Sequence, residues 1–485
     1  MTAPAVFADI HAGPWLMNLS KRGVTVKWES VEQPGTVEWG ETESLGNTLD
    51  AEYDGTAIHK ATLECLKPET RYYYRVKSGA SQTAIESFFT GPERDTPFTF
   101  VVYGDTRNNM DDHQSVVDAI VADAPEFVVH VGDLVDIAIW QPEWDDFWAV
   151  AESMTKTIPF FPIMGNHEFW GGQPLFRRYF SNPLAPADEG SRYAFSYGNA
   201  YFIMIDIAQL FIPGSAQYAW VQSQLQAAAD APGIKHCFVF AHFPPFSAAN
   251  HGEDLDVKSF RNAMTPLFEQ YDVDLVFGSH DHNYQHSKVN DIDYIVTGGG
   301  GADTYSVHPE AWTVVGEEVL NHVLVEVDGD LVTITGKRPN GSVIETFDVQ
   351  MDFGGAGTGD DFPELCYDND YDLDGIVDGE EYAGCTNPYD ADTDGDTYND
   401  GDEIDAGSDP CDPLSVPSGD DDADDDADDD ADDDADDDVD DDDDFNPPGD
   451  DDDDTAGSDD DAADDDDGTP VTGDDDDDGG GGCGC

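Results

Sequence analysis

The C-terminal part of the sequence has no basic residues. Residues 351–485 contain no Lys or Arg, although they hold 58 of the 107 acidic residues of this 485-residue chain. The other 49 acidic residues and all 20 Lys and Arg lie in residues 1–350, which are therefore only moderately acidic. Such a charge argues against nucleic acid as a partner, because its phosphates would be repelled, and it favours cations.

Long apolar runs and cysteines are also scarce. No stretch of about 18 apolar residues is present, so the sequence predicts no membrane span. The opening MTAPAVFADIHAGPW has no basic segment and no long apolar core, so it is not a complete signal peptide. Cys237 lies in an apolar run, as expected of a buried thiol. Cys366, Cys385 and Cys411 lie in an acidic region where a disulfide would indicate an oxidising compartment, with one cysteine left over.

Residues 8–92 read as a series of short strands. Polar and apolar residues alternate in runs such as GVTVKWES and RYYYRVKSG, and Gly, Pro and Asn separate the runs. This pattern predicts a small all-β sandwich. The run TRYYYRV after KPET resembles a strand of a fibronectin type III-like module, and it carries no evident chemistry.

The pattern changes in residues 97–352. Apolar runs such as TFVVYGD, EFVVHVGD and CFVFAH alternate with helix-like segments at 113–123, 216–230 and 258–272. Alternation of this kind predicts an α/β (α+β) sandwich core whose sheets are covered by helices. Five apolar runs end in Asp, Asn or His. In open α/β sheets ligands bind beyond the carboxyl ends of the strands, so these side chains are expected to converge.

The polar residues form five ordered blocks, which are YGDTR at 103–107, GDLVD at 132–136, GNHE at 165–168, AHFPP at 241–245 and SHDH at 279–282. Carboxylate, amide oxygen and imidazole are ligands for hard metal ions, and a bridging carboxylate can hold two ions about 3.5–4 Å apart for phosphoryl transfer. The blocks strongly resemble the calcineurin-like metallophosphoesterase motifs D-x-H, GDxxD, GNH[DE], H and GHxH. The preceding sandwich and the stretch GSHDHNYQH make the chain most similar to purple acid phosphatase relatives.

This resemblance implies two transition-metal ions (Fe, Zn or Mn) and a hydroxide on them that attacks phosphorus. It also implies a role for each matching residue. Asp105 and His282 would hold the first ion, Asp133 would bridge, Asn166, His242 and His280 would hold the second, and His167 would donate a proton or stabilise the transition state.

Three positions depart from the family pattern. Arg107 replaces the histidine of D-x-H, and we expect it to clamp substrate phosphate, against the alternative of a structural salt bridge. Asp136 stands where purple acid phosphatases have tyrosine, so no tyrosinate–iron bond and no purple colour are expected; Asp136 itself is a ligand or orients the ligands. Ser279 replaces the glycine of GHxH and predicts a different turn.

Other residues of these blocks have less specific roles. His251, in AANHGED, is expected to bind substrate, against the alternative of a plain loop histidine. His113 is expected to begin a helix away from the site. Tyr284 and His286 are expected to form the wall of the site, and Asp281 a turn.

Residues 366–412 contain two similar acidic units 22 residues apart, DYDLDGIVDGEE at 370–381 and DTDGDTYNDGDE at 392–403. Their carboxylates occupy positions 1, 3, 5, 9 and 12 of an EF-hand-type calcium loop. These residues are Asp370, Asp372, Asp374, Asp378, Glu381, Asp392, Asp394, Asp396, Asp400 and Glu403. Flanking helices are not predicted, and the units resemble thrombospondin type 3 calcium repeats. The alternative is a solvated acidic linker.

Residues 413–485 are mostly Asp with Ala, Gly and Pro, so they cannot bury a core and are predicted to be a disordered spacer. The final GGGGCGC resembles the segment upstream of a myxobacterial-type C-terminal sorting signal, which predicts attachment to a bacterial cell surface; the alternative is an end without function.

Together these features predict a secreted or surface-attached (extracellular or periplasmic) metallophosphoesterase that hydrolyses small phosphomonoesters and has a calcium-stabilised spacer. One alternative is a phosphodiesterase or nucleotidase with the same site. The other is a surface calcium-binding protein whose catalytic site has decayed, with Arg107 and Ser279 as the lesions. The remaining ligands are intact, which argues against decay.

Overall fold

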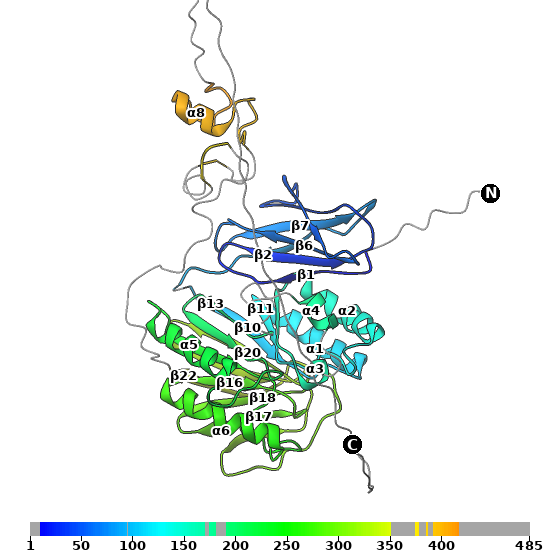
Figure 1. The fold of residues 1–485 in the computed structure, drawn as a ribbon, viewed down its shortest axis with the longest axis vertical. Helices are drawn as coiled ribbons and strands as arrows, with labels where there is room; N and C mark the ends of the chain where they lie inside the picture. Colours follow the sequence, from blue (N-terminus) through cyan, green and yellow to red (C-terminus); the bar gives the residue numbers. More distant parts are fainter. Residues whose placement is uncertain are drawn as a thin grey trace, which may run out of the picture. The chain divides into compact units, whose positions relative to one another are not determined.

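The computed structural model describes residues 10–94, 96–169, 174–180, 191–350, 374–377, 385–386 and 391–416 (Figure 1). The chain divides into two units, residues 1–419 and 420–485, and all described residues belong to the first unit. None of the helices in these ranges is long and apolar enough to cross a membrane.

Two small antiparallel sheets form the N-terminal part of the described chain (Figure 1). In order across the first sheet, the strands are β1 (Ala12–Met17), β2 (Val24–Glu29), β6 (Ile58–Leu63) and β5 (Glu52–Tyr53). In the second sheet they are β4 (Asn47–Asp50), β3 (Gly35–Gly40), β7 (Arg71–Ser78) and β8 (Ser81–Gln82), with β9 (Glu86–Phe89) also paired to β7. Alternate residues of β7 are buried, as the sequence pattern predicts for a half-buried strand. The two sheets agree with the predicted sandwich.

Two larger sheets follow. The six-stranded sheet has the order β12 (Phe160–Pro162), β11 (Phe127–His130), β10 (Phe98–Tyr103), β20 (His322–Asp328), β21 (Leu331–Lys337) and β22 (Val343–Gln350). The seven-stranded sheet has the order β13 (Tyr193–Tyr197), β14 (Ala200–Met204), β15 (His236–Phe240), β16 (Leu275–Gly278), β18 (Ile292–Thr297), β17 (Tyr284–Val289) and β19 (Thr313–Glu317). Within them β10, β11 and β12 run parallel, as do β14, β15 and β16.

Parallel neighbours need long crossover connections, and helices supply them. The helices are α1 (Met110–Asp123), α2 (Gln141–Thr155), α3 (Asn166–Phe169), α4 (Pro174–Tyr179), α5 (Ala216–Asp230) and α6 (Leu255–Gln270). The predictions at 113–123, 216–230 and 258–272 correspond to α1, α5 and α6. Sequence reasoning missed α2, although its buried residues Trp144, Trp148 and Ala151 recur at helical spacing.

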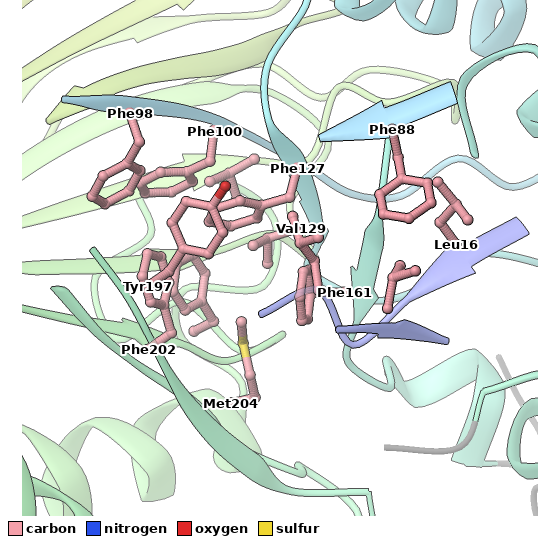
Figure 2. Close-up of a cluster of buried hydrophobic side chains, with 14 of the residues drawn as sticks. Leu16, Phe88, Phe98, Phe100, Phe127, Val129, Phe161, Tyr197, Phe202 and Met204 are labelled. Carbon is pink, nitrogen blue, oxygen red and sulfur yellow. The ribbon is translucent and has the colours of Figure 1, made fainter. Parts of the chain in front are cut away.

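Alternation along the central strands explains the layers of this core. In β10, Phe100 and Val102 belong to the buried cluster between the two sheets, whereas Val101 and Tyr103 belong to the cluster that includes α1 and α2. A third cluster joins β14, β15 and β16 to α5 and α6. Figure 2 shows the aromatic side chains of the central cluster packed together. They include Phe127 in β11 of the six-stranded sheet. The predicted α/β core with helix-covered sheets is therefore confirmed.

Aromatic residues also join the N-terminal sheets to this core. Trp15 in β1 stacks on Trp148 in α2, with ring centroids 4.3 Å apart. The hydroxyl of Tyr74 in β7 donates to the backbone oxygen of Lys156, at 2.7 Å. The cluster in Figure 2 likewise includes Leu16 and Phe88 from the small sheets. The packing thus joins the described residues of the small sheets to those of the larger core.

Candidate metal centre

The parallel strands bring the polar residues of the five blocks to one edge of each large sheet. Asp105 follows β10, Asp133 follows β11 and Asn166 follows β12, and these three strands are parallel neighbours. In the second sheet, His242 follows β15 and His280 follows β16, which are also parallel neighbours. The polar residues therefore leave their strands at the carboxyl ends, as the sequence predicts.

Unusual backbone turns aim these side chains. Asp105, Asp133 and His280 have φ values of 57°, 56° and 68°, in the left-handed region that Asp and His tolerate better than most residues. Such conformations cluster at functional sites. At Gly165 a Cβ atom would lie 2.0 Å from Asp133 Oδ1, so only glycine allows this approach of the two loops. Three strand-end turns and one glycine thus set the positions of the candidate ligands.

The residues predicted for the second ion converge. His242 Nε2 lies 2.9 Å from Asn166 Oδ1 and 3.4 Å from Asp133 Oδ1. Ligand atoms of Asp133, His242 and His280 all lie within 4.8 Å of one another. Burial and the neighbouring His242 lower the pKa of His280 well below its ordinary value, so its ring is neutral and able to bind a cation. Oxygen and nitrogen lone pairs that meet in this way fit one transition-metal ion.

The backbone carbonyl of Val131 orients the imidazole of His242. Its Nδ1 lies 2.9 Å from the Val131 oxygen, which can only accept, so Nδ1 carries the proton and Nε2 faces the site. Ser279 donates its hydroxyl to the same Val131 oxygen at 2.8 Å and lies 3.0 Å from His242 Nδ1. Ser279, where we expected a different turn, is therefore buried against the back of a candidate ligand.

Asp105 and His282, predicted to hold the first ion, face each other. Asp105 Oδ2 accepts the backbone N–H of His280 at 2.8 Å, and Asp105 Oδ1 lies 3.4 Å from His282 Nε2. His282 Nδ1 donates to the Asp303 oxygen at 2.7 Å, which leaves Nε2 toward the site. Burial opposes ionisation of Asp105, but the neighbouring side chains of His282, His242 and Arg107 lower its pKa below the ordinary value.

Arg107 lies among the residues predicted to hold the first metal ion, a place that we call the first position. Its Nη1 donates to Asp136 Oδ1 at 3.0 Å, its Nη2 donates to His282 Nε2 at 3.3 Å, and its Nε lies 3.4 Å from Asp133 Oδ2. Burial opposes the charge of Arg107, but Asp133 and Asp105 raise its pKa. Three of the acidic and histidine side chains near this position, those of Asp133, Asp136 and His282, therefore have an atom within 3.4 Å of the guanidinium.

Two further histidines border the candidate ligands. His167 Nδ1 donates to the Asp136 oxygen at 2.7 Å, and its Nε2 lies 3.8 Å from Asp133 Oδ2. His251 Nδ1 lies 2.8 Å from Asp254 Oδ2, and its ring lies 4.3 Å from that of His280. Each ring is held through Nδ1, so each Nε2 remains for a substrate group.

The remaining histidines of the sequence analysis lie elsewhere. His113 is fully buried in the first turn of α1, and its ring stacks near those of Tyr103 and Phe147. His286 Nε2 lies 2.8 Å from Asp293 Oδ1, and its ring stacks on Phe347. Within the described ranges these contacts are with core side chains, so both residues agree with supporting roles in the core.

Comparison with known proteins shows what the core is similar to. Residues 98–284 match the family of calcineurin-like phosphoesterases. Purple acid phosphatase 23 of Arabidopsis thaliana is 28% identical over 272 residues, which cover 48% of this chain and 58% of that protein. Acid phosphatase type 7 of Danio rerio is 27% identical over 357 residues, 63% of this chain and 79% of that protein. The chain spans less than two thirds of the length of the matching plant relatives.

A solved structure supports the fold of this calcineurin-like core. A purple acid phosphatase from yellow lupin (Lupinus luteus) seeds aligns with a TM-score of 0.62 at 21% identity, over 70% of this chain and 74% of that one. The comparisons thus show a core that is similar to the calcineurin-like phosphoesterases and to the purple acid phosphatases.

Glu168 and Asp281 accept hydrogen bonds that hold the loops of the site, a role that sequence reasoning did not predict. Glu168 is fully buried and accepts backbone N–H groups of both metal-site loops. Burial and the Asp133 carboxylate raise the pKa of Glu168 to about 8, while its backbone donors oppose the rise. Asp281, expected as a turn residue, accepts the Ser247 hydroxyl and the His251 N–H.

Tyr305 is a further residue that sequence reasoning missed. Its ring stacks on that of His282, with centroids 4.2 Å apart and an interplanar angle of 18°, and its N–H donates to the His282 oxygen at 2.7 Å. Asp254, which orients His251, was also missed. Both lie in loops outside the five blocks, so only the folded chain identifies them.

The second acidic unit, at residues 392–403, brings several carboxylates together. One carboxylate oxygen of each of Asp392, Asp394 and Asp396 lies within 4.8 Å of the others. Glu403, in the short helix α8 (Asp400–Ala406), is fully buried, and its carboxylate oxygens have no hydrogen bond within the described ranges. The backbone N–H of Gly401 donates to Asp374 Oδ2 at 3.1 Å. The other predicted calcium ligands, Asp370, Asp372, Asp378 and Glu381, lie outside the described residues.

Proposed function

We propose that this chain is a metal-dependent hydrolase that acts on small phosphomonoesters. The observation that carries the proposal is the convergence of Asp133 Oδ1, Asn166 Oδ1 and His242 Nε2 beside a charged guanidinium. Similarity to phosphatases supports the same reaction class. A cation-binding position next to a fixed positive charge suits a substrate that carries a dianionic phosphate.

The residues that would hold the ion are Asp133, Asn166, His242 and His280. A bound transition-metal ion supplies Lewis acidity and makes water a better nucleophile. The carbonyl of Val131 keeps the ring of His242 turned toward the ion position, as outer-shell acceptors do in metal sites. Asp105 performs the same task for the loop of His280, whose backbone N–H it accepts.

The cationic and neutral donors around the ion position would bind phosphate. Arg107 presents a planar guanidinium that suits phosphate oxygens. His167 and His251 each have Nδ1 engaged and Nε2 left over, so each can donate a proton or hydrogen bond to the leaving oxygen. Asp254 lies 2.8 Å from Nδ1 of His251, so it holds the ring in place for that role.

The alternative activities use the same residues. A phosphodiesterase or nucleotidase would need the same ion and the same donors, and it would differ only in the groups that contact the rest of the substrate. A decayed site is disfavoured because the ligand atoms of Asp133, Asn166 and His242 are within bonding range of one cation.

The proposal is tested with one purified sample. We expect full-length protein loaded with Zn, Mn or Fe to hydrolyse an aryl phosphate monoester. Protein treated with a chelator should lose this activity, because the ion that supplies Lewis acidity and activates water is then removed. Hydrolysis is measured by phosphate release on a panel of monoesters, diesters and nucleotides. If protein that holds a transition metal hydrolyses no substrate of the panel, the proposed phosphoesterase activity is ruled out.

The acidic repeats are a second proposal, with calcium as the ligand. Asp392, Asp394, Asp396 and Glu403 offer oxygen ligands on one short loop and the helix that follows it, and the buried carboxylates of Glu403 need a counter-charge. Hard oxygen ligands of this number suit Ca²⁺. The disulfide between Cys385 and Cys411 spans this loop and supports an extracellular location, since disulfides persist in oxidising compartments.

We expect calcium to stabilise the repeats. Glu403→Gln should lower the calcium affinity by at least about tenfold, because one buried ligand charge is lost. Calorimetry of the full chain with Ca²⁺ measures the affinity. The matched control is Asp405→Asn, which removes the same charge from an exposed position of α8. Equal affinities for the two variants would count against Glu403 as a ligand. Attachment to a cell surface through the C-terminal tail lies outside the described residues and stays a prediction.

A further inference from the structure

Arg107 occupies the place that the motif pattern assigns to a metal ion. The side chains of Asp105, Asp133, Asp136 and His282 come from three separate loops, since Asp133 and Asp136 share one, and the guanidinium lies near them. Three of these side chains have an atom between 3.0 and 3.4 Å from a guanidinium nitrogen. The fourth, Asp105, lies 3.4 Å from His282 Nε2. For Asp133, Asp136 and His282, the nearby cation is thus the guanidinium of Arg107, which is part of the chain.

A metal ion at this position would compete with Arg107 for the same lone pairs. Ions of the expected kind bind N and O ligands at about 2.0–2.2 Å, along the direction in which the lone pair points. At His282 that lone pair is on Nε2, because Nδ1 donates to the Asp303 oxygen, and Arg107 Nη2 already donates to Nε2. Asp136 Oδ1 is likewise engaged by Arg107 Nη1. The ion would have to displace the guanidinium from both ligands.

The charge of Arg107 cannot be removed to make room. Guanidinium stays protonated in proteins, so an ion at the first position would meet a like charge a few ångströms away. The Arg107 side chain is only 15% exposed and is held by two carboxylates on one side. The second position differs, since Asn166 Oδ1, His242 Nε2 and Asp133 Oδ1 meet without a cationic side chain between them.

We propose that Arg107 is a built-in replacement for one of the two metal ions, so that the site holds one ion beside a permanent guanidinium. This inference rests on the proposed function, because it assumes that the second position binds a metal. In this proposal, Arg107 supplies a permanent positive charge that a chelator cannot remove. This charge faces the carboxylate of Asp133. The phosphate would then be bound between one metal ion and one arginine.

Counting metal ions tests the proposal. Full-length protein is loaded with Zn²⁺ and passed through a desalting column in excess Ca²⁺, which saturates the acidic repeats and tail, and zinc per chain is then measured by elemental analysis. We expect one zinc for the wild type, one for Arg107→Lys, which keeps the charge, and two for Arg107→His, which supplies a neutral ligand. Electron paramagnetic resonance with Mn²⁺ gives an independent readout, an isolated ion in the wild type and a coupled pair in Arg107→His.

The outcomes separate this inference from the proposed function. Two zinc ions, or a coupled manganese pair, in the wild type would overturn the replacement by Arg107 and leave the enzyme proposal standing. One ion in both the wild type and a folded Arg107→His, checked by circular dichroism, would also overturn it, since Arg107 would not be what keeps the second ion out. A wild type with no zinc would remove the metal site itself, and both proposals with it.

Discussion

Replacing His242 with alanine is expected to remove the bound metal ion and with it the hydrolysis of phosphoesters. The imidazole is fully buried, and its Nε2 is the atom on which Asn166 and Asp133 converge. Loss of an outer-shell partner costs about 10–100-fold in metal affinity or activity, so loss of a direct ligand should cost more than about 100-fold. Metal content and phosphate release on the same sample measure both effects.

The control must show that the loss is local. His308→Ala removes an exposed histidine outside the candidate site and should leave metal content and rate unchanged. Thermal unfolding of both variants is compared in a chelator, so that the stabilising effect of a bound ion is absent from each curve. An unfolded His242→Ala protein would move the test to Asn166→Ala, where the expected loss is the same. A folded variant with wild-type metal content and rate would refute the ligand assignment.

The ligand side chains and their strands could be predicted from sequence because local chemistry specifies them. Apolar runs rich in Val, Ile and Phe form the central strands whatever surrounds them, and an Asp or His placed just after such a run must leave at the carboxyl end. Asp133 and His242, 109 positions apart in sequence, were therefore predictable neighbours. The helix α2 was missed although its buried residues recur at helical spacing, because its Trp and Phe residues suit a strand as well as a helix.

The contacts between loops could not be predicted, because they depend on how distant segments meet. Arg107 was expected to face substrate, and nothing near it in sequence indicates that His282 and Asp136 would surround its guanidinium. Tyr305 stacks on His282 from a loop that carries no motif. Glu168 belongs to a recognised block, but its role depends on backbone N–H groups of the loop at 132–135, which only the fold brings within reach.

Replacing Glu168 with alanine should destabilise the fold more than other single changes near the site. The buried carboxylate accepts four backbone N–H groups, those of Asp133 at 2.9 Å, Leu134 at 2.9 Å, Val135 at 3.2 Å and Gly165 at 2.8 Å. A buried donor left without a partner costs about 1–3 kcal/mol, so the free energy of unfolding should fall by at least about 3 kcal/mol. Denaturant titration of metal-free protein measures this change.

Glu143→Ala is the matched control for this prediction. Glu143 also accepts two backbone N–H groups of the same loop, from Asp136 and Ile137 at 2.7 Å each, but it does so at a partly exposed position where water can replace it. Its loss should cost about 1 kcal/mol. Because Glu168 joins the loop of Asp133 to the loop of the neighbouring candidate ligands, Glu168→Ala should also weaken metal binding about 10–100-fold, as outer-shell changes do. If the two variants lost equal stability and bound metal alike, Glu168 would be an ordinary buried acid and would not set the distance between the two loops.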